Sequence, residues 1–334
     1  RYPQRVGGLE CAIGLAGVGR YSDAIRLAES HELGLPPQHS VLARALKDVG
    51  YSTAICGKWH LGYEPKFLPT RQGFDHYYGI PYSNDMLKKS AETKVPVVPV
   101  LRDEKVVELM DGEGQRRMVE LYTKEAVDFI TRSKDQPFYL YFAHNAVHTP
   151  IWPGAAFAGK SQNGRFGDWV EEVDWSVGQV LDTLRAQGLD KDTLVVFTSD
   201  NGPARRSAGP LRGSKGTTFE GGVREPCLMR WPGKIKASQI ANDLVDFSDF
   251  LPTLAEFAEA DLPTGIKLDG HSFASRLTDG QTSPRTWAFA EHGKRLATAS
   301  RQATSGEEGP PNLLPINHIP PVKSVQHISI YLIL

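Results

Sequence analysis

Three times along this chain, an amphipathic helical pattern is followed directly by a short apolar strand pattern. The expected helices cover residues 41–49, 119–130 and 168–188, and the strands that follow them cover 51–56, 138–142 and 194–198. Near-continuous apolar strands that alternate with helices are typical of a parallel sheet covered on both faces. The sequence therefore predicts an α/β fold with a mostly parallel central sheet flanked by helices.

The expected helix ends carry recognisable signals. Ser40 is placed to cap the first helix, and Gly50 to end it. Asp168 and Glu171 have the spacing of a capping box, which predicts that the third helix begins at Asp168.

Composition excludes several classes of function. The 334 residues hold 38 Lys and Arg against 39 Asp and Glu, a net charge of −1, whereas nucleic-acid binders usually need a basic excess. No apolar run approaches the roughly 18 residues of a membrane span. Three cysteines cannot build a disulfide framework. The first residues contain neither Met nor the pattern of a signal peptide, so they do not indicate the localisation.

Polar residues gather where the three predicted strands end. The first strand is followed by Lys58 and His60, which would point the same way in an extended backbone. The second is followed by His144, Asn145 and His148, and the third by Asp200 and Asn201. In open α/β sheets, ligands bind just beyond the carboxyl ends of the strands. The three clusters therefore predict one shared site.

Each cluster has an ordinary alternative when taken alone. Lys58 would be a solvated lysine, His60 a packed histidine, and Asp200-Asn201-Gly202 a common turn. Of the two histidines after the second strand, His148 is favoured for chemistry over His144. Taken together, the three clusters favour a functional site over the ordinary alternatives.

The residue types favour the binding of an anion together with a hard cation. Asp200 and Asn201 offer adjacent oxygen ligands that suit Ca²⁺ or Mg²⁺, although two ligands are too few for a stable site. Lys58, His60 and His148 would supply positive charge and proton transfer around an anion. Zinc is disfavoured because no zinc-binding motif is present.

Residues 211–226 are the densest polar segment, and their glycines would let the backbone approach a ligand. Lys215 lies there between Ser214 and Gly216, so the segment is not a nucleotide P-loop, which needs Gly before the Lys and Ser or Thr after it. The glycines at 14, 17 and 19 lack the spacing of a dinucleotide-binding loop.

Five motifs together resemble the type I, formylglycine-dependent sulfatases, and most closely the arylsulfatase A-like members. These motifs are Gly57-Lys58-Trp59-His60-Leu61-Gly62, Ile80-Pro81-Tyr82-Ser83-Asn84-Asp85, His148-Thr149-Pro150, Thr198-Ser199-Asp200-Asn201-Gly202-Pro203 and residues 216–226. The resemblance extends from the first residues to about Glu291. It implies an alkaline phosphatase-like fold and hydrolysis of a sulfate monoester by a metal-assisted covalent mechanism.

The resemblance also implies a role for each residue of the site. Lys58 and Lys215 would neutralise the sulfate, His60 would lie beside the formylglycine hydroxyl, and His148 would protonate the leaving oxygen. Ser83 would contact the sulfate. Asp200 and Asn201 would bind Ca²⁺, with Mg²⁺ as the alternative. The substrate would be a small-molecule or glycan sulfate ester, and the family suggests a secreted, periplasmic or lysosomal location.

The sequence departs from the family pattern at both ends. None of Cys11, Cys56 and Cys227 is followed by the x-P-x-R pattern of the formylglycine precursor. Arg1-Tyr2-Pro3 resembles the residues just after that motif, so we expect the nucleophile and the strand carrying two early aspartates to be missing. We expect a catalytic α/β domain over residues 1–262. Residues 263–334 would be the remnant of a C-terminal subdomain, ending in an irregular tail with a short, isolated β-prone segment at 327–334.

The prediction is a sulfuric ester hydrolase whose present chain is inactive by itself. A phosphodiesterase or phosphonate hydrolase of the same superfamily is one alternative. A non-catalytic anion-binding relic is another, and an incomplete gene model would account for the unusual ends.

Overall fold

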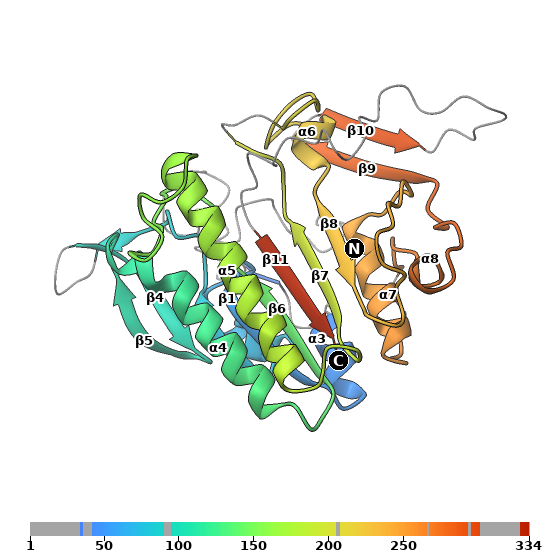
Figure 1. Ribbon diagram of the computed structural model, residues 1–334, viewed down its shortest axis with the longest axis horizontal. Coiled ribbons are helices and arrows are strands. Elements are labelled where there is room, and N and C mark those ends of the chain that lie inside the picture. Colours follow the sequence, from blue (N-terminus) through green and yellow to red (C-terminus); the bar gives the residue numbers. More distant parts are fainter. Residues whose placement is uncertain are drawn as a thin grey trace.

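A computed structural model describes residues 34–35, 42–89, 95–204, 208–265, 267–292, 295–300 and 328–333. Within them, nine strands form one sheet in the order β3-β4-β2-β1-β6-β11-β7-β8, with β5 paired to β4 (Figure 1). The strands of this sheet are β1 (Ser52–Lys58), β2 (His76–Ile80), β3 (Lys88–Lys89), β4 (Pro96–Arg102), β5 (Lys105–Met110), β6 (Phe138–Ala143), β7 (Leu194–Ser199), β8 (Cys227–Arg230) and β11 (Ile328–Ile333).

The three predicted helix–strand units are confirmed. Helix α3 (Leu42–Asp48) precedes β1, α4 (Met118–Arg132) precedes β6, and α5 (Gly164–Ala186) precedes β7. β1 pairs in parallel with β2 and with β6. β6 and β7 are both antiparallel to β11 and therefore run in the same direction. The predicted cap Ser40 lies outside the described residues.

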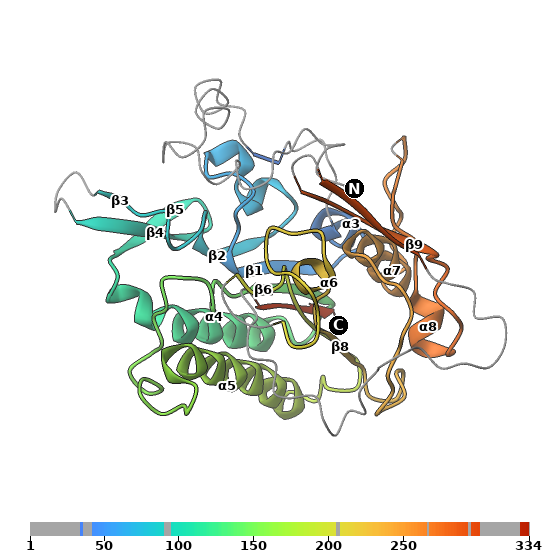
Figure 2. The ribbon, with the colours of Figure 1, turned by 90° about the horizontal axis from the view of Figure 1, so that it is seen from above.

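Helices cover both faces of the sheet, as the apolar strands predicted (Figure 2). Alternation along β1 directs Ala54 and Cys56 to the core shared with α4 and α5, and Ile55 to the core shared with α3 and α7 (Phe250–Phe257). Each face of the sheet therefore has its own hydrophobic core, which holds the ends of the strands in place from both sides.

The predicted start of α5 is wrong. The helix begins at Gly164, so Asp168 lies in its second turn. The buried Asp168 carboxylate instead accepts hydrogen bonds from the backbone N–H groups of Gly159, Lys160 and Ser161 at 2.7–3.0 Å. The carboxylate thus satisfies N–H groups of the loop before the helix. The spacing of Asp168 and Glu171 in the sequence cannot distinguish this role from that of a helix cap. Among the described helices, none is long and apolar enough to cross a membrane.

The β-prone end of the chain is not an isolated strand. β11 lies between β6 and β7 and pairs antiparallel with both, with Ile330 opposite Phe142 on one side and Phe197 on the other. Its backbone thereby satisfies the inward-facing hydrogen-bonding groups of two central strands. The sheet around it keeps β2, β1, β6 and β7 in one direction, with antiparallel strands at the centre and at the edges.

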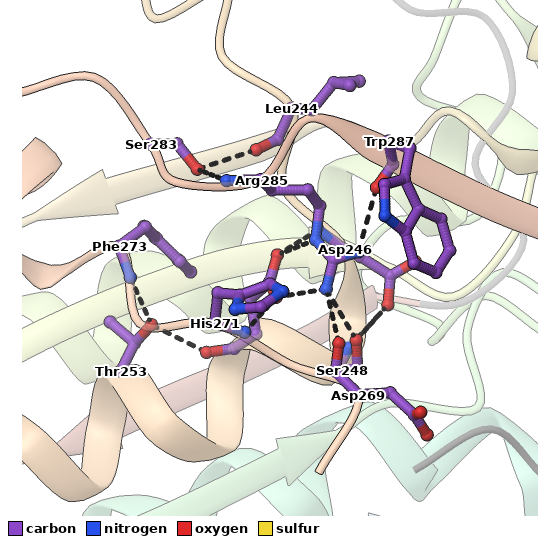
Figure 3. A network of polar contacts seen from close by, with 11 residues as sticks. Leu244, Asp246, Ser248, Thr253, Asp269, His271, Phe273, Ser283, Arg285 and Trp287 are labelled. Atoms are coloured by element: carbon purple, nitrogen blue, oxygen red, sulfur yellow. Dashed lines mark hydrogen bonds and ion pairs between the residues drawn. The ribbon is translucent and has the colours of Figure 1, made fainter. Parts of the chain in front are cut away.

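Polar contacts around the buried Arg285 join the segment before β9 to the residues directly before α7 (Figure 3). Arg285 donates to both carboxylate oxygens of Asp249 at 2.5 and 2.6 Å, and each side chain is only 1% exposed. The same guanidinium donates to the carbonyl oxygens of Asp269 and Trp287. Trp287 begins β9 (Trp287–His292), which pairs with β10 (Arg295–Ser300) in a separate small sheet, and α8 (Ala274–Thr278) lies between α7 and β9 in the chain. The proposed boundary at residue 262 is thus crossed by a strong polar contact.

Candidate active site

Close backbone packing marks the carboxyl end of β1. Gly57 has φ +125°, and a Cβ there would lie 1.8 Å from the carbonyl oxygen of Ala143 in β6. A Cβ at Gly79 of β2 would lie 1.7 Å from the carbonyl oxygen of Gly57. Only glycine fits these two positions, and together they bring the ends of three strands close to each other beside Lys58.

His60 does not continue the extended backbone of β1. The strand ends at Lys58, and His60 has φ +60°, in the left-handed region. The backbone N–H groups of Trp59 and His60 donate to the carbonyl oxygens of Ile80, the last residue of β2, and of Pro81, which follows it. The extended backbone on which the expected alternation of Lys58 and His60 depends therefore ends before His60, because a positive φ interrupts the period of two.

The two histidines after β6 have different environments. His144 is 1% exposed, and its Nε2 lies 3.1 Å from the Ser176 hydroxyl on α5. Burial lowers the pKa of His144 to about 3, so its ring is a neutral part of the core. His148 is half-buried, and its Nδ1–H donates to the Thr149 carbonyl oxygen at 2.6 Å. In the neutral ring, Nε2 is then the nitrogen that accepts a proton.

Charges from three other segments surround His148. Burial, the Lys58 ammonium and the Lys215 ammonium lower its pKa, whereas the Asp85 carboxylate acts in the opposite direction. The structure thus brings together the predicted residues Lys58, His148 and Lys215. Asp85 is not among the predicted site residues, and its place in the loop after β2 is the sequence signal that points to it.

The loop after β2 packs against the segment that carries His148. Ser83 and Asn84 are buried, and the Asn84 amide donates to the Gln115 side chain at 3.2 Å and to the Pro150 carbonyl oxygen at 3.5 Å. In the described part of the chain, the buried Ser83 hydroxyl has no hydrogen-bond partner. A buried, unsatisfied hydroxyl beside a cluster of charges is suited to a bound ligand.

Backbone contacts hold the end of β7 against residues 211–226, the glycine-rich segment. The Gly202 N–H donates to the Gly222 carbonyl oxygen at 3.1 Å, and the Lys215 N–H donates to the Pro203 carbonyl oxygen at 2.9 Å. A Cβ at Gly202 would lie 2.0 Å from the carbonyl oxygen of Gly221 in the short helix α6 (Glu220–Val223). Lys215 is therefore fixed relative to Asp200 and Asn201, which immediately precede Gly202.

Asp200 has neighbours whose side-chain oxygens could bind a cation. The Oδ1 atom of Asn201 is buried without a hydrogen-bond partner among the described residues. Burial and the nearby Asp200 carboxylate raise the pKa of Glu225 to about 7, while a hydrogen bond with Ser199 opposes this shift. Carboxylate and amide oxygens suit a hard cation such as Ca²⁺ or Mg²⁺. The described residues contain no group of three or more His, Cys, Asp or Glu side chains arranged to hold a metal. The donor types therefore fit such a cation, but further ligands would be required.

The described cysteines do not provide a nucleophile at this site. Cys56 is buried within β1, where burial raises the pKa of its thiol, and Cys227 begins β8. Cys11 lies outside the described residues. A separate cleft of about 520 Å³ lies between α7 and the segment 270–272, and it contains none of the predicted site residues.

Comparison with known proteins gives a consistent picture. The family model described as Sulfatase matches residues 15–260. The chain is 38% identical over 268 residues to N-acetylgalactosamine-6-sulfatase of Mus musculus, which covers 75% of the chain and 51% of that protein. It is 38% identical over 288 residues to arylsulfatase A of Homo sapiens, covering 79% of the chain and 56% of that protein.

A solved structure supports the same relationship. The PsFucS1 sulfatase from Pseudoalteromonas sp. superposes with a TM-score of 0.70 at 27% identity, covering 78% of this chain and 59% of that chain. The chain spans about half the length of the curated relatives it matches.

Proposed function

The chain belongs to the sulfatase family, and from this premise we propose that it forms most of the catalytic domain of a sulfuric ester hydrolase. The observation that carries the proposal is the cluster around His148. Lys58 and Lys215 come from segments far apart in the sequence, yet both ammonium groups act on this one imidazole. Two cations beside a proton-transfer group suit an ester that carries negative charge on several oxygens.

Lys58 and Lys215 would bind the sulfate oxygens and offset the charge that develops as the ester bond breaks. A bound sulfate would in turn neutralise part of the field that the two lysines exert on His148. The pKa of His148, lowered in the anion-free protein, would then rise. The substrate thereby favours the protonated ring, which can donate its Nε2 proton to the leaving oxygen.

Two further predicted residues would complete the binding of the ester. Ser83 would donate its hydroxyl to a sulfate oxygen, since this hydroxyl is buried and has no partner within the described residues. His60 follows Lys58 at the same strand end, where its ring would assist proton transfer on the opposite side of the sulfate.

Asp200 and Asn201 would hold a divalent cation, with Ca²⁺ favoured and Mg²⁺ as the alternative. When bound, the cation would supply positive charge to the sulfate oxygens. No described cysteine fits the precursor of a formylglycine, so no nucleophilic step is assigned to these residues. We propose accordingly that this chain binds sulfate esters without turning them over.

Calorimetric titration of the 334-residue chain with sodium sulfate, with and without Ca²⁺, tests the binding. Lys58→Ala and Lys215→Ala should each weaken sulfate binding. Lys124→Ala should not, because Lys124 is an exposed lysine of α4 that pairs with Asp128. Equal sulfate affinity in all four proteins would refute the proposed anion site.

Hydrolysis assays test the proposed lack of turnover and separate the alternatives. The chain should turn over neither an aryl sulfate nor an aryl phosphate. Turnover of the aryl sulfate would refute the inactivity. Turnover or tighter binding of the phosphate ester would favour a phosphodiesterase or phosphonate hydrolase. Sulfate binding without any effect of Ca²⁺ would favour a non-catalytic anion-binding protein.

The substrate class follows from the family, and the described residues do not narrow it further. N-acetylgalactosamine-6-sulfatase and arylsulfatase A match this chain with similar identity. We therefore propose a sulfate ester of a glycan or of a small molecule.

A further inference from the structure

The pairing of β7 with β8 places a second carboxylate beside Asp200. The two strands are antiparallel, with Val195 opposite Arg230 and Thr198 opposite Cys227. Asp200 and Glu225 lie just beyond the paired residues, each two positions past the Thr198–Cys227 pair, so both are at the same end of the two strands. The effect of the Asp200 charge on Glu225 agrees with this placement.

Two neighbouring carboxylates repel each other when both are ionised, which is destabilising. Glu225 is also held in place, because the buried Ser199 hydroxyl hydrogen-bonds its carboxylate. Its Oε1 atom is buried and has no hydrogen-bond partner within the described residues. The described part of the chain therefore offers this carboxylate oxygen no donor, although it lies next to a second negative charge.

The side-chain amide of Asn201 also has an oxygen atom without a hydrogen-bond partner in the described residues. Its Oδ1 atom is buried without a partner in the described segments, although an amide oxygen readily accepts a hydrogen bond. The residue that follows Asp200 and the residue whose pKa the Asp200 charge raises thus each carry one buried, unsatisfied oxygen. A cation bound between them would satisfy both oxygens and remove the repulsion between the two carboxylates.

We propose that Glu225 is a third oxygen ligand of the divalent cation that Asp200 and Asn201 bind, an inference that rests on the function proposed above. Glu225 lies near the C-terminal end of the glycine-rich segment 211–226, between α6 and β8. The cation therefore links the end of β7 to the segment that carries Lys215. Three oxygen donors suit Ca²⁺, which prefers six to eight oxygen ligands and would take the remainder from other groups.

The test compares Ca²⁺ binding and metal-free stability in four proteins. These are the wild-type chain, Glu225→Gln, Asp200→Asn and Glu220→Gln. Glu220 is the matched control because it lies on α6, is half-exposed and pairs with Arg224. Calorimetry measures the affinity for Ca²⁺, with Mg²⁺ in a parallel series, and thermal unfolding in EDTA measures the stability without metal.

Glu225→Gln should weaken Ca²⁺ binding about tenfold or more, as should Asp200→Asn, because the ligand charge decreases. Glu220→Gln should bind Ca²⁺ as the wild type does. In EDTA, Glu225→Gln should unfold at the same temperature as the wild type or at a higher one, because the like-charge pair is removed. A residue with only a structural role would instead lower the unfolding temperature in EDTA.

Several results would overturn the inference. These are wild-type Ca²⁺ affinity in Glu225→Gln, a lowered unfolding temperature of this variant in EDTA, or a wild-type chain that binds neither Ca²⁺ nor Mg²⁺. Sulfate titration separates this inference from the proposed function. If the wild type binds Ca²⁺ through Glu225 but does not bind sulfate, the proposed function fails and the cation ligand stands.

Discussion

Acidification should destabilise this protein through one buried imidazole, that of His144. The ring packs against Phe142, with ring centroids 4.2 Å apart, and Nε2 contacts the Ser176 hydroxyl. Within the described residues, Nδ1 is buried without a hydrogen-bond partner, so a second ring proton would have no acceptor. Burial lowers the pKa of His144 from 6.5 to about 3.

The sign and size of the effect follow from linkage. Below pH 6.5 the unfolded chain takes up a proton at this residue, whereas the folded chain does so only near pH 3. The free energy of unfolding should therefore fall by about 1.4 kcal/mol for each pH unit below 6.5, which amounts to roughly 3 kcal/mol at pH 4.5. Below pH 3 the loss should level off.

Urea unfolding at pH 7.5 and 4.5 measures how much the free energy of unfolding decreases on acidification. The wild type is compared with His144→Gln, which lacks the titrating ring. The variant should be the less stable protein at pH 7.5. Between the two pH values it should lose roughly 3 kcal/mol less than the wild type. Ser176→Ala is the control, because it removes the hydroxyl partner but keeps the imidazole, so it should follow the pH dependence of the wild type. An equal loss in the wild type and His144→Gln would refute the assignment of a neutral, buried ring.

Three further predictions concern the site and the scaffold. Gly202→Ala would place a Cβ 2.0 Å from a backbone oxygen of α6, and it should cost about 1–3 kcal/mol in chemical unfolding and weaken Ca²⁺ binding. Arg285→Met should cost about 3–5 kcal/mol, because it leaves the Asp249 carboxylate buried without its counter-ion; a double variant that also carries Asp249→Asn should recover part of that loss. Lys215→Ala should weaken sulfate binding about tenfold. It should also raise the pKa of His148, followed by NMR titration of the ring, because one of the cations that lower this pKa is removed.

Local sequence patterns were sufficient for most of the scaffold. The apolar runs that became β1, β6 and β7, and the helical stripes before them, have the periods that burial on two faces requires. The predictions from these patterns were wrong where one pattern is compatible with two different structures. Asp168 has the spacing of a helix cap but bonds the preceding loop, and His60 follows a strand but adopts a left-handed backbone.

No local sequence pattern could predict where β11 lies in the sheet. Its β-prone residues indicated a strand, but pairing with β6 and β7 depends on main-chain groups more than a hundred residues earlier in the chain. The same limit applies to Glu225, whose interaction with Asp200 depends on the pairing of β7 with β8. Asp85 likewise acquires its relation to His148 only when two loops meet.

The amino-acid sequence by itself determined the alternation of helices and strands, the polar residues at the strand ends and the family to which the chain belongs, because these properties depend on residue type and short-range spacing. Only the tertiary structure decided which charges act on each other. It separated the buried His144 from His148, brought the charges of Lys58, Lys215 and Asp85 to act on the latter, and brought Asp200 near enough to raise the pKa of Glu225. The physical reason is that electrostatic interactions depend on distance and burial, and both are set by the pairing of strands and the packing of loops from distant parts of the chain.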